Sequence, residues 1–135
     1  MNYLGIDFGE AKIGLALGSD ETGLALPIDI IYYREVVDAL AQIRDILVSD
    51  SIDKIVLGQP RKLSGADMTS ERLKEFEEKL HEFNCPIVME DERFSTGVAS
   101  SLKKAFNFSS GDDDSVAAAA ILQNYLDRER HGKNV

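Results

Sequence analysis

The spacing of hydrophobic residues changes along the chain, and each spacing predicts one type of element. Up to residue 33, apolar residues fall in extended runs that are separated by short segments rich in glycine and acidic residues. This pattern predicts an antiparallel meander of three strands. The strands are expected at residues 3–8, 12–18 and 24–33.

After residue 34 the apolar residues recur at helical spacing, and helices then alternate with short strands. Helices are expected at residues 34–47, 68–83, 95–106 and 115–130, and strands at residues 52–60 and 85–92. A meander followed by β-α-β crossovers predicts an α/β fold with a mixed sheet, parallel strands in its centre and helices on both faces. The 135 residues, 44% of them hydrophobic, fit one domain over residues 1–135.

Charge and composition exclude several classes of protein. A net charge of −9 argues against a broad basic surface for nucleic acid. The sequence has no apolar run near the roughly 20 residues of a membrane span and no signal-peptide pattern, so a cytoplasmic protein is expected. The single cysteine, Cys85, is expected to be a small buried hydrophobe. His81 and His131 are expected on the surface, which disfavours zinc sites and Ser-His-Asp triads.

One acidic residue, Asp7, interrupts the first predicted strand. Because strand side chains alternate between faces, Gly5, Asp7 and Gly9 share one face. Glycine inside a strand loses packing and costs chain entropy, so two glycines beside one acid indicate that something approaches the backbone there. We expect a metal ion and a phosphate to use this space.

Further polar residues lie where other strands end. Ligand sites in such sheets lie beyond the carboxyl ends of the parallel strands. The fourth strand leads into Gln59, Arg61 and Lys62, the fifth into Asp91 and Glu92, and Asp112, Asp113 and Asp114 precede the last helix. If that helix packs across the first strand, one of these three acids comes beside Asp7.

Neighbouring carboxylates repel each other, and either protonation or a bound cation relieves the repulsion. Oxygen ligands without histidine suit Mg²⁺ or Mn²⁺. Two such ions about 4 Å apart can hold the attacking and leaving oxygens of a phosphodiester. Simpler interpretations stay open: Asp112 to Asp114 as a helix cap, and Asp91 and Glu92 with Arg93 as a surface ion pair. Asp7 is harder to explain in this way, because burying an unpaired charge on a central strand is costly.

Four segments together resemble a known family. "GIDFGEAKIGLALGSD", "IVLGQPRKLSG", "DERFST" and "DSVAAAAILQNYL" are similar, in order and spacing, to the signature blocks of the YqgF-like (RuvX) family of the RNase H-like superfamily. The resemblance runs from about residue 4 to 126. It implies an RNase H-like fold and a nuclease that uses Mg²⁺ or Mn²⁺. The implied substrates are the 5′ end of pre-16S rRNA or, as an older proposal, Holliday junctions.

The resemblance also implies roles for individual residues. It assigns the catalytic acids to Asp7, Asp114 and one of Asp91 and Glu92, of which we favour Glu92 as the metal ligand. Candidate substrate contacts are Gly9, Lys12, Gln59, Arg61, Lys62, Arg93, Ser95 and Thr96. Many members carry a basic pair at positions 11–12 and a basic run before the last helix, where this chain has Ala11-Lys12 and "SSGDDD". Phosphate contacts then move to Arg61, Lys62, Arg72, Lys103 and Lys104, or a partner such as the ribosome supplies positive charge.

Three functions therefore stay open at this point. The first is a metal-dependent endonuclease that cuts structured RNA, with branched DNA as a second substrate, and that works as a monomer or homodimer. The second is a non-catalytic module of the same fold that binds nucleic acid or the ribosome. The third is a nucleotide-binding protein of the actin-like class, suggested by "GIDFG", although that class closes two such domains around the nucleotide.

Overall fold

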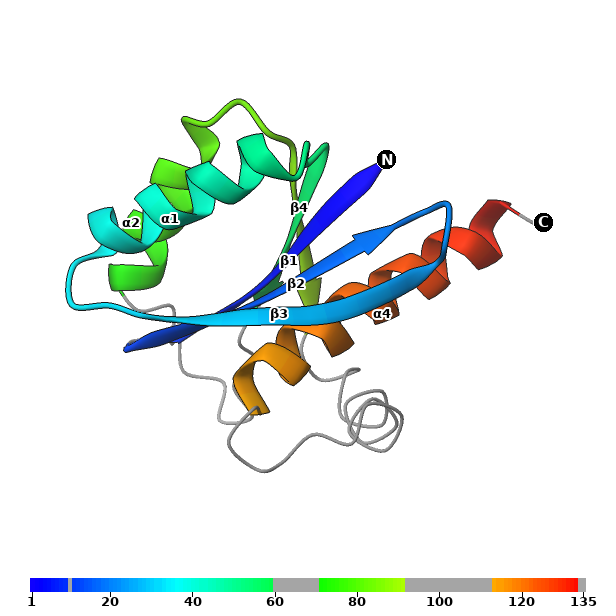
Figure 1. Ribbon diagram of the computed structural model, residues 1–135, viewed down its shortest axis with the longest axis horizontal. Helices are drawn as coiled ribbons and strands as arrows, with labels where there is room; N and C mark the ends of the chain where they lie inside the picture. Colours follow the sequence, from blue (N-terminus) through cyan, green and yellow to red (C-terminus); the bar gives the residue numbers. More distant parts are fainter. Residues whose placement is uncertain (10, 60–70, 92–112, 134–135) are drawn as a thin grey trace.

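Five strands form one mixed sheet in the order β3-β2-β1-β4-β5 (Figure 1). The computed structural model describes residues 1–9, 11–59, 71–91 and 113–133. The strands are β1 (Asn2–Phe8), β2 (Lys12–Ser19), β3 (Leu24–Tyr32), β4 (Lys54–Gln59) and β5 (Ile87–Asp91). β1, β2 and β3 pair antiparallel, and β4 pairs parallel with both β1 and β5. The predicted meander and mixed sheet are confirmed. The prediction of a parallel centre is wrong, because β1 is the middle strand and the parallel strands fill one half.

Helices cover both faces of the sheet, as predicted (Figure 1). α1 (Val36–Ser49) and α2 (Glu71–His81) lie on one face, and α4 (Asp113–Lys133) lies on the other. α2 ends two residues earlier than predicted, because after His81 the backbone amides bond to carbonyls three residues back, and Asn84 then takes a left-handed φ of 57°. The helix expected at 95–106 and the predicted start of α2 at 68–70 lie outside the described residues.

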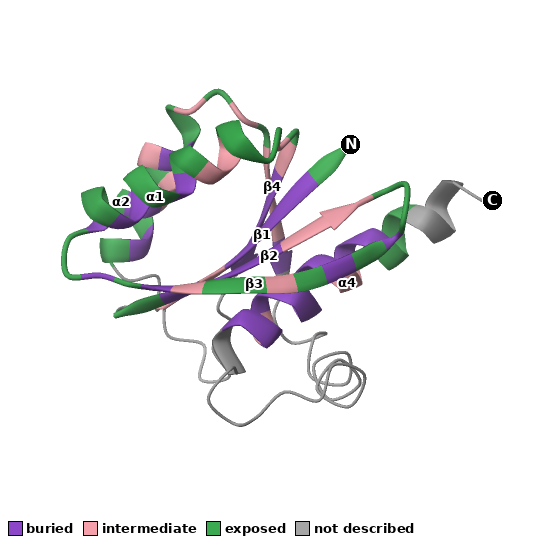
Figure 2. Ribbon diagram, in the orientation of Figure 1, coloured by how far each residue is buried: buried purple, intermediate pink, exposed green. Residues whose placement is uncertain are grey.

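Two apolar cores lie on the two faces, as the buried positions show (Figure 2). β1 contributes to both: Leu4, Ile6 and Phe8 face α1 and α2, whereas Tyr3 packs with α4. This alternation follows from the two-residue period of a strand. β1 is therefore held from both sides, and a charged residue on it occupies a central, constrained position.

α4 passes unusually close to β1 at Gly5. A Cβ atom at Gly5 would lie 2.8 Å from Leu122 Cβ and 2.9 Å from the Ala118 carbonyl oxygen. At Gly9 a Cβ atom would lie 2.5 Å from the Lys12 carbonyl oxygen, across the turn between β1 and β2. The prediction that both glycines make room for a metal and a phosphate is therefore wrong for Gly5, whose space is taken by the helix. At Gly9 the space is taken by the turn itself.

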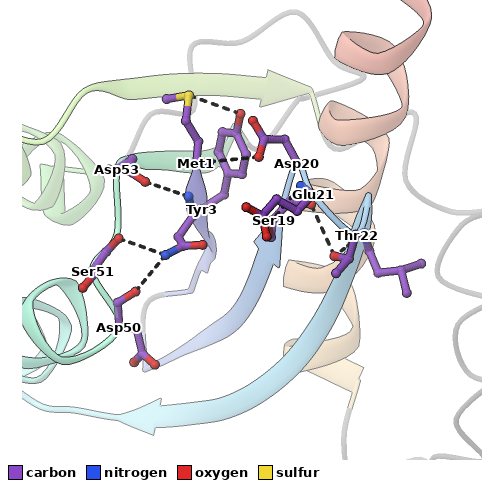
Figure 3. Close-up of polar contacts among 11 residues, drawn as sticks. Met1, Tyr3, Ser19, Asp20, Glu21, Thr22, Asp50, Ser51 and Asp53 are labelled. Atoms are coloured by element: carbon purple, nitrogen blue, oxygen red, sulfur yellow. Dashed lines mark hydrogen bonds and ion pairs between the residues drawn. The ribbon is translucent and has the colours of Figure 1, made fainter.

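The start of β1 is fastened at the end of the sheet remote from Asp7 (Figure 3). The Asn2 backbone amide donates a 2.8 Å hydrogen bond to Asp53, and the Met1 amine pairs with Asp20 at 2.9 Å. A surface hollow of about 270 Å³ lies at this end, lined in part by Leu17 and Leu24. None of the predicted site residues that the structure describes is among its lining residues.

Within the described parts of the chain, no helix is both long enough and apolar enough to cross a membrane.

Candidate active site

Asp7 is half-buried near the end of β1, and glycines flank it on both neighbouring strands. In β2 its register partner is Gly14. In β4, Leu57 pairs with Ile6, so the register brings Gly58 beside Asp7. Neither neighbour has a side chain, so this row of the sheet offers one carboxylate and bare backbone. The clearing around Asp7 thus comes from across the strands, which sequence spacing within one strand did not predict.

The first turn of α4 lies toward the end of β1 that carries Asp7. α4 runs antiparallel to β1 (Figure 1): Tyr3 meets Tyr125 with ring centroids 5.8 Å apart, and Gly5 meets Ala118 and Leu122. Two strand residues advance about 6.7 Å and one helical turn about 5.4 Å. Two residues beyond Gly5 along β1 is Asp7, and one turn before Ala118 along α4 is the first turn of the helix. Asp7 therefore lies opposite the turn that contains Asp114.

Lys12 lies on the same face as Asp7. It is the first residue of β2, it is exposed, and the two-residue period gives it the face of Gly14. Its position is directly across from Gly9 at the β1–β2 turn. The structure therefore places one of the predicted phosphate contacts close to the candidate acid.

Arg72, by contrast, lies behind the β1–β2 turn. Its guanidinium carbon is 5.9 Å from the centre of the Tyr33 ring, and Tyr33 Oη donates a 2.6 Å hydrogen bond to the Gly9 carbonyl oxygen. Tyr33 also packs against Phe8, with ring centroids 6.1 Å apart. This side of the turn is the side of α1 and α2, so Arg72 is on the face opposite Asp7.

The remaining predicted site residues are only partly described. The backbones of Gln59 and Asp91 pair with each other at the ends of β4 and β5, and Asp114 is the second residue of α4. Six candidates lie outside the described residues: Arg61, Lys62, Glu92, Arg93, Ser95 and Thr96. Lys103 and Lys104 do as well.

Asp7 places one carboxylate, an oxygen donor, at this part of the sheet. In the part of the chain that the structure describes, no three side chains of His, Cys, Asp or Glu gather in a group able to hold a metal ion. Asp7 is the one residue of the predicted metal set whose side chain is described. The Asp7 carboxylate is a hard oxygen donor, and the glycines on the neighbouring strands leave space beside it. Such a donor fits Mg²⁺ or Mn²⁺ and suits zinc poorly.

A second acid, Glu90, was not predicted from the sequence. It lies on β5 with 1% of its surface exposed, and it faces α4 as Val88 does. Arg128 of α4 forms a bidentate ion pair with its carboxylate, and Asn124 donates to it as well. Glu90 is therefore contacted by α4 about three to four helical turns from Asp114. The signal in the sequence was an acid at a position where strand alternation calls for an apolar residue.

Cys85 is half-buried, whereas the sequence predicted a buried residue, and it packs at the edge of the core that faces α1 and α2. Burial, and to a lesser extent the charge of Asp53, raise the pKa of Cys85. Since only the thiolate is nucleophilic, we expect Cys85 to react with iodoacetamide at pH 8 several times more slowly than free cysteine. Mass spectrometry of a time course tests this, with the urea-unfolded chain as the control. Equal rates in the folded and unfolded chains would contradict it.

The fold and the sequence both match known proteins. The family model for RuvX, described as Holliday junction resolvase, matches residues 1–128. The chain belongs to the RuvX family. A relative from Orientia tsutsugamushi (strain Ikeda), named "Putative pre-16S rRNA nuclease", is 36% identical over 97% of this chain and 87% of its own length.

Solved structures of resolvases are similar to this RuvX-family chain. RuvC of Thermus thermophilus in complex with a Holliday junction substrate aligns over 96% of each chain, with a TM-score of 0.66 and 13% identity. The Fowlpox virus resolvase with Holliday junction DNA aligns over 96% of this chain and 99% of its own, with a TM-score of 0.60 and 12% identity. These likenesses show the RNase H-like fold, as the sequence predicted.

Proposed function

We propose that this RuvX-family chain is a divalent-metal-dependent endonuclease that cuts structured nucleic acid. The observation that carries the proposal is the setting of Asp7: a carboxylate on the central strand, between Gly14 and Gly58, opposite the first turn of α4. A structural acid would not need bare backbone on both sides. A site that admits a phosphate would need it, because the phosphate must approach the strand backbone closely.

The proposed metal ligands are Asp7, Glu92 and Asp114. The register of β5 supports Glu92 over Asp91: Val88 and Glu90 face α4, whereas Asp91 has the strand parity of Met89, which packs toward α1 and α2. One or two Mg²⁺ or Mn²⁺ ions, when bound, supply a water of lowered pKa and offset the charge on the phosphate. The carboxylates hold and orient these ions, and the central position of β1 keeps Asp7 fixed during the reaction.

The proposed substrate is structured RNA, with the 5′ end of pre-16S rRNA first. The name of the Orientia relative supports RNA, and the resolvases solved with Holliday junction DNA support branched DNA as the second substrate to test. Lys12 would contact the phosphate backbone beside Asp7. The other proposed contacts are Gly9, Gln59, Arg61, Lys62, Arg93, Ser95 and Thr96. We further propose one nuclease domain over residues 1–135, acting in the cytoplasm as a monomer or homodimer.

A non-catalytic binding module is the second candidate, and the net charge of −9 favours it. Each lost lysine or arginine removes a phosphate contact and the counterion release that goes with it. A positively charged partner, such as the ribosome, would then be needed for nucleic-acid binding. The RuvX match favours either of these functions over the actin-like, nucleotide-binding hypothesis.

The deciding experiment is cleavage of a substrate panel at low salt. The panel holds single-stranded RNA, an RNA stem with a pre-16S-like 5′ end and a four-way DNA junction, each with Mn²⁺ or with EDTA. Cutting that needs Mn²⁺ supports the nuclease and identifies its substrate. Binding of the panel without any cutting would instead favour the binding module.

A further inference from the structure

A cluster around the buried Glu90 carboxylate joins the edge strand β5 to helix α4, and its arginine keeps 58% of its side chain exposed. We name it the Glu90 clamp, formed by Glu90, Asn124 and Arg128. Arg128 Nη1 donates a 2.8 Å hydrogen bond to Glu90 Oε1, and Arg128 Nη2 donates to Oε2. Asn124 Nδ2 donates a 3.2 Å hydrogen bond to Oε1. Both oxygens of the buried carboxylate are thus used by one helix.

Stability alone is a poor explanation for the clamp. Taking the Glu90 carboxylate out of water is costly, and its partner Arg128 is more than half exposed, so solvent weakens the attraction that would offset this cost. β5 already presents Val88 to the α4 core, so an apolar residue at position 90 could extend that core. A bidentate arginine pair instead fixes direction as well as distance, because two parallel hydrogen bonds allow one orientation.

Of the two elements that the clamp joins, α4 carries the proposed ligand Asp114, and β5 ends at the residue before the proposed ligand Glu92. Glu92 follows Glu90 by two residues in the sequence, and Asp114 is the second residue of the helix that carries Arg128. β5 is the edge of the sheet, so it has a strand neighbour on one side only. An edge strand needs a further contact if its end is to be held within the few tenths of an ångström that a metal site demands.

We propose that the Glu90 clamp positions the metal site by fixing β5, and with it Glu92, relative to α4 and Asp114. This inference rests on the proposed metal-dependent function. Glu90 and Arg128 are positioning residues here, since they act through the strand and the helix and touch no reacting atom.

The test is a calorimetric Mn²⁺ titration of the full chain without substrate. We compare the parent with Glu90→Gln, Arg128→Gln and the double variant, at a temperature where circular dichroism shows each to be folded. Each single variant is expected to bind Mn²⁺ about tenfold more weakly, the low end of the effect of an outer-shell change. The double variant is expected to lose no more than the worse single variant, because both changes break one link.

The control is a destabilising change on the opposite face of the sheet. Ile43→Val removes a methyl from the fully buried α1 side chain and leaves the clamp intact. It is expected to lower the melting temperature while leaving Mn²⁺ affinity unchanged. Arg128→Lys keeps the charge without the bidentate fork, so it is expected to stay impaired.

Three results would overturn the proposal, and they are distinguishable. If Asp7→Asn abolishes Mn²⁺ binding while both clamp variants bind like the parent, the clamp has no positioning role and the metal site stands. If Ile43→Val weakens binding as much as the clamp variants, general destabilisation explains them all. If the parent itself binds no Mn²⁺, the proposed function fails and the clamp proposal fails with it.

Discussion

Replacing Asp7 by asparagine is expected to lower metal-dependent cleavage about a thousandfold or more. The change keeps the size of the side chain and removes the negative charge that the proposed ions require. The melting temperature is expected to stay the same or rise, because a group of repelling acids loses one charge. Initial rates on the best substrate of the panel, with Mn²⁺ in excess, measure the first effect, and a thermal melt measures the second.

Asp29→Asn is the matched control for this experiment. Asp29 is an exposed aspartate on β3, and its carboxylate accepts a hydrogen bond from the amide of Ile30. The same chemical change there is expected to leave cleavage within about twofold of the parent, because a surface change away from the site has little effect. An Asp7→Asn variant that cuts as fast as the parent would refute the proposed role of Asp7.

Replacing Gly5 by alanine is expected to destabilise the protein by about 2–3 kcal/mol, an overpacking effect. The added Cβ atom would lie 2.8 Å from Leu122 Cβ and 2.9 Å from the Ala118 carbonyl oxygen, so α4 must move away from β1. For a chain of this length the melting temperature should fall by about 10 °C. Because the same shift displaces the start of α4 relative to Asp7, Mn²⁺ affinity is expected to fall as well.

Gly18→Ala provides the comparison. Its added Cβ atom would lie 2.9 Å from Leu122 Cδ2 and 3.0 Å from Leu126 Cδ1, which are ends of flexible side chains, and 3.1 Å from the Leu24 carbonyl oxygen. Methyl groups can move by a few tenths of an ångström, so the loss of stability should be smaller than at Gly5. Denaturant unfolding of both variants gives the difference. Equal losses would mean that the approach of the α4 backbone to Gly5 has no special cost.

The parts of the fold that depend on neighbouring residues were predictable from the sequence. The meander of β1, β2 and β3 follows from alternation and short turns, and the amphipathic helices follow from their spacing. The end of α2 was harder to predict, since the left-handed backbone at Asn84 depends on the turn that follows. Helix boundaries depend on such single residues, whereas the existence of a helix depends on a whole apolar stripe.

The surroundings of Asp7 were predictable only in part. Glycine in a strand indicated a close approach, yet the sequence does not say whether a ligand or a helix approaches, and at Gly5 it is α4. The glycines that do flank Asp7, Gly14 and Gly58, become its neighbours through strand register. Register between β1 and β4 is set by tertiary packing across an intervening helix, which no local pattern encodes.

The buried ion pair of Glu90 was also predictable only in part. An acid in the apolar run before Asp91 could be recognised as unusual, but its partner Arg128 follows 38 residues later. Which cation reaches a buried carboxylate depends on how α4 crosses the sheet. The sequence therefore identifies Glu90 as unusual, and only the packed structure identifies Arg128 as its partner.

The position of α4 in the chain sets an order of folding during synthesis. The five strands of the sheet precede α4, and among the described residues this helix is the element that covers the sheet face formed by Tyr3, Ala16, Ala25 and Val56. On the ribosome, that apolar face stays exposed until residues up to about 126 have emerged, a stage at which chaperones are expected to bind. Asp7 and the proposed ligand Asp114 meet in the same docking event. Under the proposed mechanism, a nascent chain would therefore be unable to cut RNA until α4 has emerged and docked on the sheet.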